Sequence, residues 1–303
     1  MAAVGAAVGA AATGLGALTK QAVSAYSAYE QLTGGVDTLF KTASDQVMQY
    51  ANNAYKTAGL SANAYMDTVT SFSASLIASL DGNTAAAAEK ANGAITDMSD
   101  NANKMGTSME SIQNAYQGFA KQNYTMLDNL KLGYGGTKEE MERLLADAEK
   151  ITGIHYDISS FADITDAIHV IQTELDITGT TAKEAATTVE GSINMTKAAW
   201  ENLVTGLGDK NADLDGLIGN FVDSAETMLT NLLPVVEKSI AGIGELIADL
   251  APIIADKLPG IISEVLPNLL KAASDLVQGL ITGIISALPA LIPVAVQVVL
   301  ELV

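Results

Sequence analysis

Residues that could support catalysis are few and lie far apart in the sequence. The only two histidines are His155 and His169. A nucleophilic triad needs a base within reach of a serine. The apolar run AIHVIQ around His169 instead predicts a histidine packed on a helix, and His155 is predicted to lie in a loop. The single tryptophan, Trp200, is interpreted as a core residue and not as a ligand contact.

Three short motifs only imitate binding sites. The run Gly133–Lys138 is glycine-rich, but its threonine precedes its lysine, so it fails the phosphate-loop order and predicts a turn into a capped helix. Asn211–Gly216 resembles the start of a calcium loop, yet the twelfth position is Val222 instead of the bidentate glutamate, which favours an acidic, solvated turn. Glu139 and Glu140 stand among basic residues, as on a solvated helix face. We therefore predict no catalytic residue, no metal site and no bound cofactor, and hence no enzyme.

The composition excludes further classes of function. The 303 residues carry a net charge of −19 and contain no cysteine, so disulfides, thiolate nucleophiles and cysteine-bound metals are excluded. Sequence-specific nucleic-acid binding requires clustered basic residues, whereas Arg143 is the only arginine and the lysines are scattered. Because 49% of the residues are apolar and only 5% aromatic, the core is expected to consist of Ala, Leu, Ile and Val.

The placement of proline favours an all-α fold. All six prolines lie in the last 70 residues, and proline costs about 3 kcal/mol in a helix interior, so the first 233 residues can form long helices. No sustained two-residue alternation predicts a sheet. The spacing predicts helices joined by short glycine turns, at 16–58, 61–80, 84–104, 108–131, 138–151, 160–175 and 181–206.

Capping signals predict where these helices begin. In a capping box, a Ser or Thr side chain caps the helix and a Glu three residues later reaches back. Thr107–Glu110, Thr137–Glu140 and Thr181–Glu184 fit this pattern, each after a glycine that could end the preceding helix. Weaker starts of the same kind are Ser61, and Asn83 or Thr84.

Two uncharged stretches allow either a membrane or a buried environment. Residues 276–300 would form a helix of about 38 Å, longer than the roughly 30 Å core of a bilayer. The alternative is a buried helix pair broken at Pro289 and Pro293. Residues 1–19 are mostly Ala and Gly and favour close helix packing through the Gly5/Gly9 spacing over membrane insertion.

The chain divides into four regions by composition. Residues 1–19 form an Ala/Gly-rich apolar helix, 20–206 a helical domain, 207–233 an acidic connecting segment, and 234–303 a series of proline-punctuated apolar helices. In the last region a proline followed by branched aliphatics recurs, as in a degenerate repeat. Its wide apolar face must be covered by other helices, other copies or lipid.

One family resemblance runs through the chain. Two adjacent sequence segments closely resemble tail tape-measure proteins of long-tailed, non-contractile phages and prophages of Gram-positive hosts. They are NAYQGFAKQNYTMLDNLKLGYGG (114–136) and TKEEMERLLADAEKI (137–151). The resemblance covers about residues 20–230. Further segments that resemble the family occur in the same order along the chain, at 28–41, 54–80, 95–122, 167–192 and 198–224.

The resemblance implies a structural function. Such a protein lies in the lumen of the virion tail, templates tail length during assembly in the host cytoplasm, and is released at genome ejection, when it could enter the host membrane. Its implied partners are the tail-tube protein, tail assembly chaperones, distal-tail proteins and other copies of itself. The alternative from the uncharged stretches is an α-helical membrane-active or pore-forming protein. A continuous helix of 303 residues spans at most about 450 Å, which is short for such a tail, so a shortened or partial chain is also expected.

Overall fold

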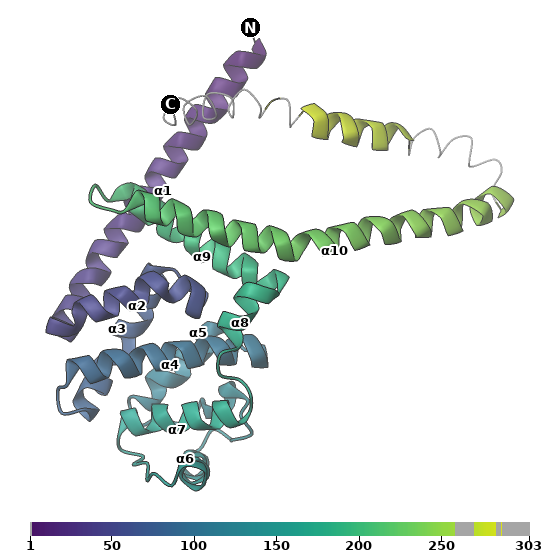
Figure 1. The fold of residues 1–303 in the computed structure, drawn as a ribbon. Coiled ribbons are helices and arrows are strands. Elements are labelled where there is room, and N and C mark those ends of the chain that lie inside the picture. Colours follow the sequence, from purple (N-terminus) through teal and green to yellow (C-terminus); the bar gives the residue numbers. More distant parts are fainter. Residues whose placement is uncertain (1, 258–269, 283–285, 287–303) are drawn as a thin grey trace. The chain divides into compact units, whose positions relative to one another are not determined.

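The fold is all-α, as the sequence predicts. The computed structural model describes residues 2–257, 270–282 and 286, and these residues contain helices, turns and loops but no strand (Figure 1). The chain divides into two compact units, Met1–Leu233 and Pro234–Val303.

Most helices belong to the first unit. They are α1 (Ala2–Phe40), α2 (Ser44–Thr57), α3 (Ala62–Ser79), α4 (Thr84–Met105), α5 (Met109–Phe119), α6 (Lys138–Thr152), α7 (Phe161–Glu174), α8 (Thr180–Thr187) and α9 (Val189–Gly208). Short 3-10 turns cover Lys41–Ala43 and Leu127–Leu130. The long helix α10 (Leu214–Lys257) begins in the first unit and continues into the second, where residues 270–282 are also helical.

Three predicted helix starts are confirmed. The Ser61 side chain accepts a hydrogen bond from the backbone N–H of Ala64, and Asn83 caps α4 in the same way. Thr137 caps α6 by accepting from the N–H of Glu140. Because each of these bonds joins residues three apart, the local sequence is sufficient to specify it.

Two other predicted starts are wrong. Helix α5 is capped by Ser108, one residue after the predicted Thr107, whose hydroxyl instead donates to the Asn129 carbonyl at 3.1 Å. Helix α8 starts at Thr180 after Gly179, and the Thr181–Glu184 capping box does not form. The cap of α8 comes from a side chain of another helix, Asp100.

Three predicted helices are also shorter than expected. The helix predicted over 16–58 breaks at Lys41, which has a left-handed φ of +52°, and the one over 108–131 ends at Phe119, before Gln122 at φ +58°. The helix predicted over 181–206 is preceded by α8 and starts afresh after extended Thr188. A Cβ on Gly191 would lie 2.4 Å from the Glu184 carbonyl oxygen, so glycine permits the tight corner between α8 and α9.

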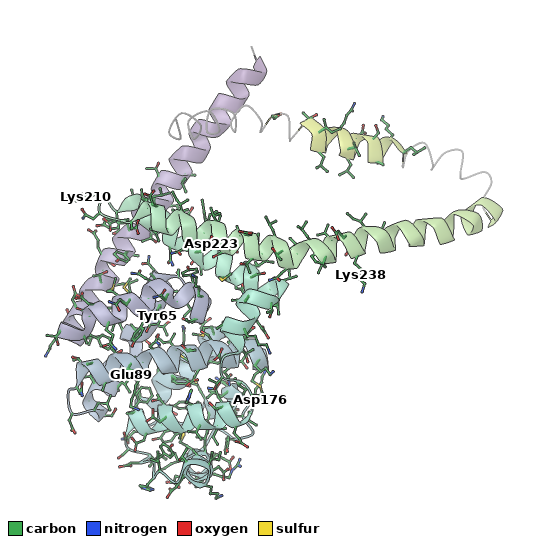
Figure 2. All side chains as sticks on the ribbon, viewed as in Figure 1. Tyr65, Glu89, Asp176, Lys210, Asp223 and Lys238 are labelled. Carbon is green, nitrogen blue, oxygen red and sulfur yellow. The ribbon has the colours of Figure 1, made fainter. Side chains whose placement is uncertain are left out.

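Aromatic side chains contribute more to the core than the composition suggests. Phe40, Tyr65, Tyr116 and Phe119 are among the largest fully buried side chains, and they pack with Leu, Ile, Met and Ala from α1 to α7. Figure 2 shows Tyr65 among these helices. The prediction of a purely aliphatic core is therefore wrong, because the few aromatics are concentrated inside the first unit.

The predicted boundaries correspond unevenly to the observed elements. Helix α1 runs across the boundary between 1–19 and 20–206, and most of 207–233 is the beginning of α10 instead of a loose connection. Helix α10 passes through Pro234 without ending. The side-chain environment of Gly5 and Gly9 is outside the described part of the structure, and so is that of most of residues 276–300. The packing predicted for these residues therefore stays a prediction.

Candidate interaction surfaces

The first candidate surface is an uncovered apolar stripe on α10. Within the first unit it consists of Leu214, Ile218, Val222, Leu229 and Leu233, whose side chains are 37–54% exposed. Their spacings of four, four, seven and four residues place them within about a third of the helix circumference. We call these five residues the apolar stripe.

The opposite face of α10 packs on the preceding helices of the first unit. The Thr196 hydroxyl on α9 donates to the Ser224 carbonyl at 2.8 Å, and the rings of Trp200 and Phe221 lie 5.3 Å apart between their centroids. The Asn231 side chain donates to the backbone carbonyl of Thr188 at 3.1 Å. These contacts hold α10 by one face and leave the residues of the apolar stripe about half exposed.

The same pattern of apolar residues continues in the second unit. After Leu229, the next residues of this pattern are Val236, Ile240 and Ile243, at successive spacings of seven, four and three residues. They are 41–65% exposed. In residues 270–282, Leu270, Leu276, Val277, Leu280 and Ile281 are also exposed. Seven-residue spacing of aliphatic side chains is typical of helices that pack along one another in coiled coils.

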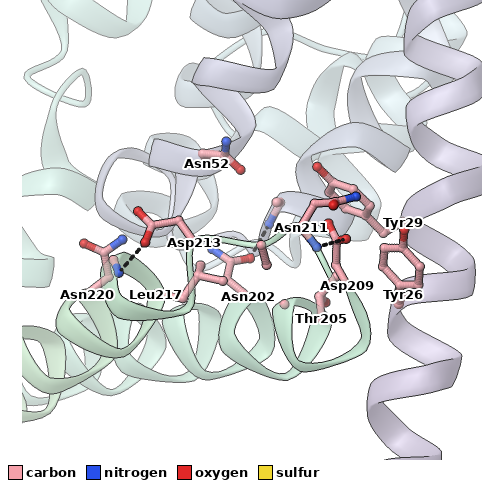
Figure 3. A pocket seen from close by; sticks show the side chains of 14 residues that line it. Tyr26, Tyr29, Asn52, Asn202, Thr205, Asp209, Asn211, Asp213, Leu217 and Asn220 are labelled. Atoms are coloured by element: carbon pink, nitrogen blue, oxygen red, sulfur yellow. Dashed lines mark hydrogen bonds between the residues drawn. The ribbon is translucent and has the colours of Figure 1, made fainter.

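The second candidate surface is a polar cleft where α9 joins α10 (Figure 3). We call it the junction cleft. It holds about 340 Å³ between α1, α2, the start of α3, the end of α9, the connection 209–213 and the first two turns of α10. The residues that line it include Tyr26, Tyr29, Asn52, Asn202, Asp209, Asp213 and Asn220.

Two ion pairs join α4 to α7 elsewhere in the first unit. The His169 ring nitrogen Nδ1 lies 2.9 Å from the carboxylate of Asp97, and the Lys90 ammonium donates to Asp166 at 2.6 Å. Burial raises the pKa of Asp97, an effect partly opposed by His169. The hydrogen bond to Asp97 in turn raises the pKa of His169. The predicted helix position of His169 is confirmed, but its ring is half exposed and paired with a carboxylate.

A buried carboxylate on α4 also holds the start of α8. Asp100 is fully buried and accepts hydrogen bonds from the backbone N–H groups of Gly179 at 2.6 Å and Thr181 at 2.7 Å. Sequence reasoning missed both Asp97 and Asp100. Their partners stand more than 70 residues away in the chain, so no local pattern marks them.

The remaining motifs have structural roles in the described part of the chain. His155 lies in the connection from α6 to α7 and pairs with Glu149, as a loop residue would. Gly133–Lys138 forms the predicted turn into capped α6, and Glu140 pairs with Arg143 at 2.6 Å on an exposed face. Trp200 is 36% exposed, so its assignment to the core is wrong.

The predicted calcium-like turn serves as a helix start. The Asp209 carboxylate accepts from the N–H of Asn211 at 2.9 Å, and that of Asp213 accepts from the N–H of Gly216 at 3.1 Å in the first turn of α10. In the part of the chain that the structure describes, no three His, Cys, Asp or Glu side chains are grouped so that they could hold a metal ion.

Among the described residues, no helix combines the length and the hydropathy needed to cross a membrane. Comparisons with known proteins identify no relative: no family model, no curated protein and no solved structure matches the chain.

Proposed function

We propose that the chain acts as a tape-measure-type structural protein of a phage or prophage tail. In this function it lies in the tail lumen, sets tail length during assembly, and leaves the tail at genome ejection, when it could enter the host membrane. Its partners would be the tail-tube protein, assembly chaperones, distal-tail proteins and other copies of itself. The resemblance of residues 20–230 to that family motivates the proposal.

The observation that carries the proposal is the apolar stripe of α10. Five Leu, Ile and Val side chains are about half exposed along one face, and an apolar surface of this extent usually marks a site of association. A tape measure needs such a surface, because copies that lie along a tube must pack lengthwise. Helix α10 contains 44 residues and so extends over about 66 Å.

The arrangement of charge agrees with this function. The net charge of −19 disfavours retention on nucleic acid, so a protein that leaves the tail ahead of the genome would not adhere to it. We propose a structural role without catalysis.

The test is to follow the polypeptide through infection. Tails purified before and after triggered genome ejection are analysed by quantitative mass spectrometry, with the tube protein as internal standard. We expect this chain at a fixed ratio to the tube protein before ejection and a large loss afterwards. Its absence from filled tails would overturn the proposal.

A further inference from the structure

The junction cleft is rich in hydrogen-bond acceptors, and no basic side chain lines it. Asp209 and Asp213 supply carboxylates, and Asn52 and Asn220 supply amide groups. No lysine, arginine or histidine is among the residues that line the cleft. Such an environment repels anions such as phosphate and favours a ligand that is positively charged and rich in donors.

The two carboxylates are held in place but not neutralised. Each uses one oxygen, Oδ1, to accept a backbone N–H, from Asn211 for Asp209 and from Gly216 for Asp213. Among the described residues, no ion pair joins either carboxylate to a basic side chain. Both carboxylates therefore retain charge for an external partner.

Two tyrosines from α1 add an aromatic wall. Tyr26 and Tyr29 are stacked, with ring centroids 6.2 Å apart and an angle of 18° between the planes. Burial raises the pKa of Tyr26, and the negative charges of Asp209 and Glu30 raise it further. The hydroxyls thus stay neutral, and the field of Asp209 reaches the rings.

Close helix approach keeps this wall next to Asp209. A Cβ on Gly208, at the end of α9, would lie 2.6 Å from Cβ of Tyr26 and 2.7 Å from the Ala22 carbonyl oxygen. Glycine at this position therefore lets the segment that carries Asp209 lie against α1. The aromatic and acidic walls come from segments about 180 residues apart, and the fold brings them together in one cleft (Figure 3).

We propose that the junction cleft receives the guanidinium group of an arginine side chain presented by a partner protein. A guanidinium is planar, stacks on aromatic faces and carries five N–H donors that match carboxylate and amide oxygens. The volume of about 340 Å³ is at the small end of ligand sites and suits one long side chain. A metal ion fits less well, since the described residues group no three metal-binding side chains. This inference does not depend on the tape-measure role.

The test uses the full chain and short synthetic peptides. The probe is a neutral glycine–serine peptide with one central arginine, and its matched controls carry citrulline, which is isosteric but uncharged, or lysine. Binding is followed by the methyl resonances of Leu217 and Thr205, which line the cleft. We expect saturable shifts with the arginine peptide, at least about fivefold weaker affinity for lysine because it cannot stack or fork, and no saturation with citrulline.

Charge-removing variants locate the site. Asp209→Asn and Asp213→Asn keep an oxygen that accepts the same backbone N–H, and asparagine is an equally good helix cap. Asp209→Asn, next to the tyrosines, is expected to weaken binding of the arginine peptide about tenfold, because a charge-assisted hydrogen bond becomes a neutral one. Asp213→Asn, at the end of the cleft near Asn52 and Asn220 (Figure 3), should weaken it less. The control is Asp215→Asn, which removes the same charge from the same helical turn outside the cleft lining and should change affinity less than twofold.

Three results would overturn the proposal. The first is no saturable shift with the arginine peptide while all variants melt like the parent. The second is an equal loss of affinity in Asp215→Asn, which would indicate only general attraction to a protein of net charge −19. The third is tighter binding of free arginine than of the peptide. That result would assign the cleft to a small molecule, because the free carboxylate should otherwise be repelled by Asp209 and Asp213.

Discussion

Replacing two apolar side chains of the apolar stripe should weaken self-association of the chain and leave the fold of the first unit intact. The double variant Val222→Gln/Leu229→Gln changes two residues that are seven apart on α10 and belong to neither buried cluster of the first unit. Glutamine is a good helix former, so the helix itself should persist. We expect the melting temperature of the first unit to stay close to that of the parent, because exposed substitutions typically change stability by about 0.5 kcal/mol or less.

The loss of association follows from the exposed fractions. Val222 is 53% and Leu229 50% exposed, so about half of each side chain remains to be buried by a partner. Full burial of such a side chain contributes about 1.5–3 kcal/mol, and the exposed half about 0.8–1.5 kcal/mol. Losing both removes about 1.5–3 kcal/mol for each chain, or about 3–6 kcal/mol for a pair of variant chains, which weakens self-association about 150- to 25,000-fold.

Sedimentation velocity over a concentration series measures this change. The matched control is Asp223→Gln/Thr230→Gln, which has the same seven-residue spacing on the exposed polar side of α10 and should associate like the parent. Equal self-association of parent, stripe variant and control would refute the reasoning. A stripe variant that no longer melts cooperatively would also contradict it, because the stripe would then support the fold.

The other predictions concern the interior of the first unit. The hydrogen bond to Asp97 raises the pKa of His169, so the folded state binds more protons than the unfolded chain near neutral pH, and the melting temperature should fall as pH rises from about 6 to about 9. A pH scan of His169→Gln should show a smaller slope, and an unchanged slope would exclude this pair as its source. Asp100→Ala leaves two buried N–H groups at the start of α8 unpaired and should cost about 3 kcal/mol in urea unfolding, whereas no loss would show that the cap is dispensable. Gly208→Ala places a Cβ against α1 and should cost about 1–3 kcal/mol, while the control Gly93→Ala meets nothing within 4 Å and should be neutral or stabilising. Equal calorimetric effects of the two alanines would contradict the close contact of α1 and α9.

Features that depend on neighbours in the sequence could be predicted. The absence of proline before residue 234 and the lack of alternation indicate the all-α class. Ser61, Asn83 and Thr137 were predictable caps because each bonds an N–H three residues away. The turn at Gly133–Lys138 follows from its glycines in the same way.

Features that depend on tertiary contact could not be predicted. Lys41 adopts a left-handed conformation without any glycine or proline signal, so the break after α1 was hidden. The start of α8 depends on Asp100, about 80 residues earlier in the chain. The junction cleft joins Tyr26 to Asp209, which only the packing of α9 on α1 brings together. Trp200 lies partly exposed because its ring covers Phe221 and not the main core.

Tail length in particles with an altered α10 tests the central claim most directly. Deleting residues 236–249 removes fourteen residues, or two seven-residue repeats, and preserves the face that the stripe occupies. If one residue of helix sets about 1.5 Å of tail, tails measured by electron microscopy should shorten by about 21 Å, and duplicating the same residues should lengthen them by about 21 Å. Assembled tails of unchanged length in both variants would contradict the proposed role as a tape measure.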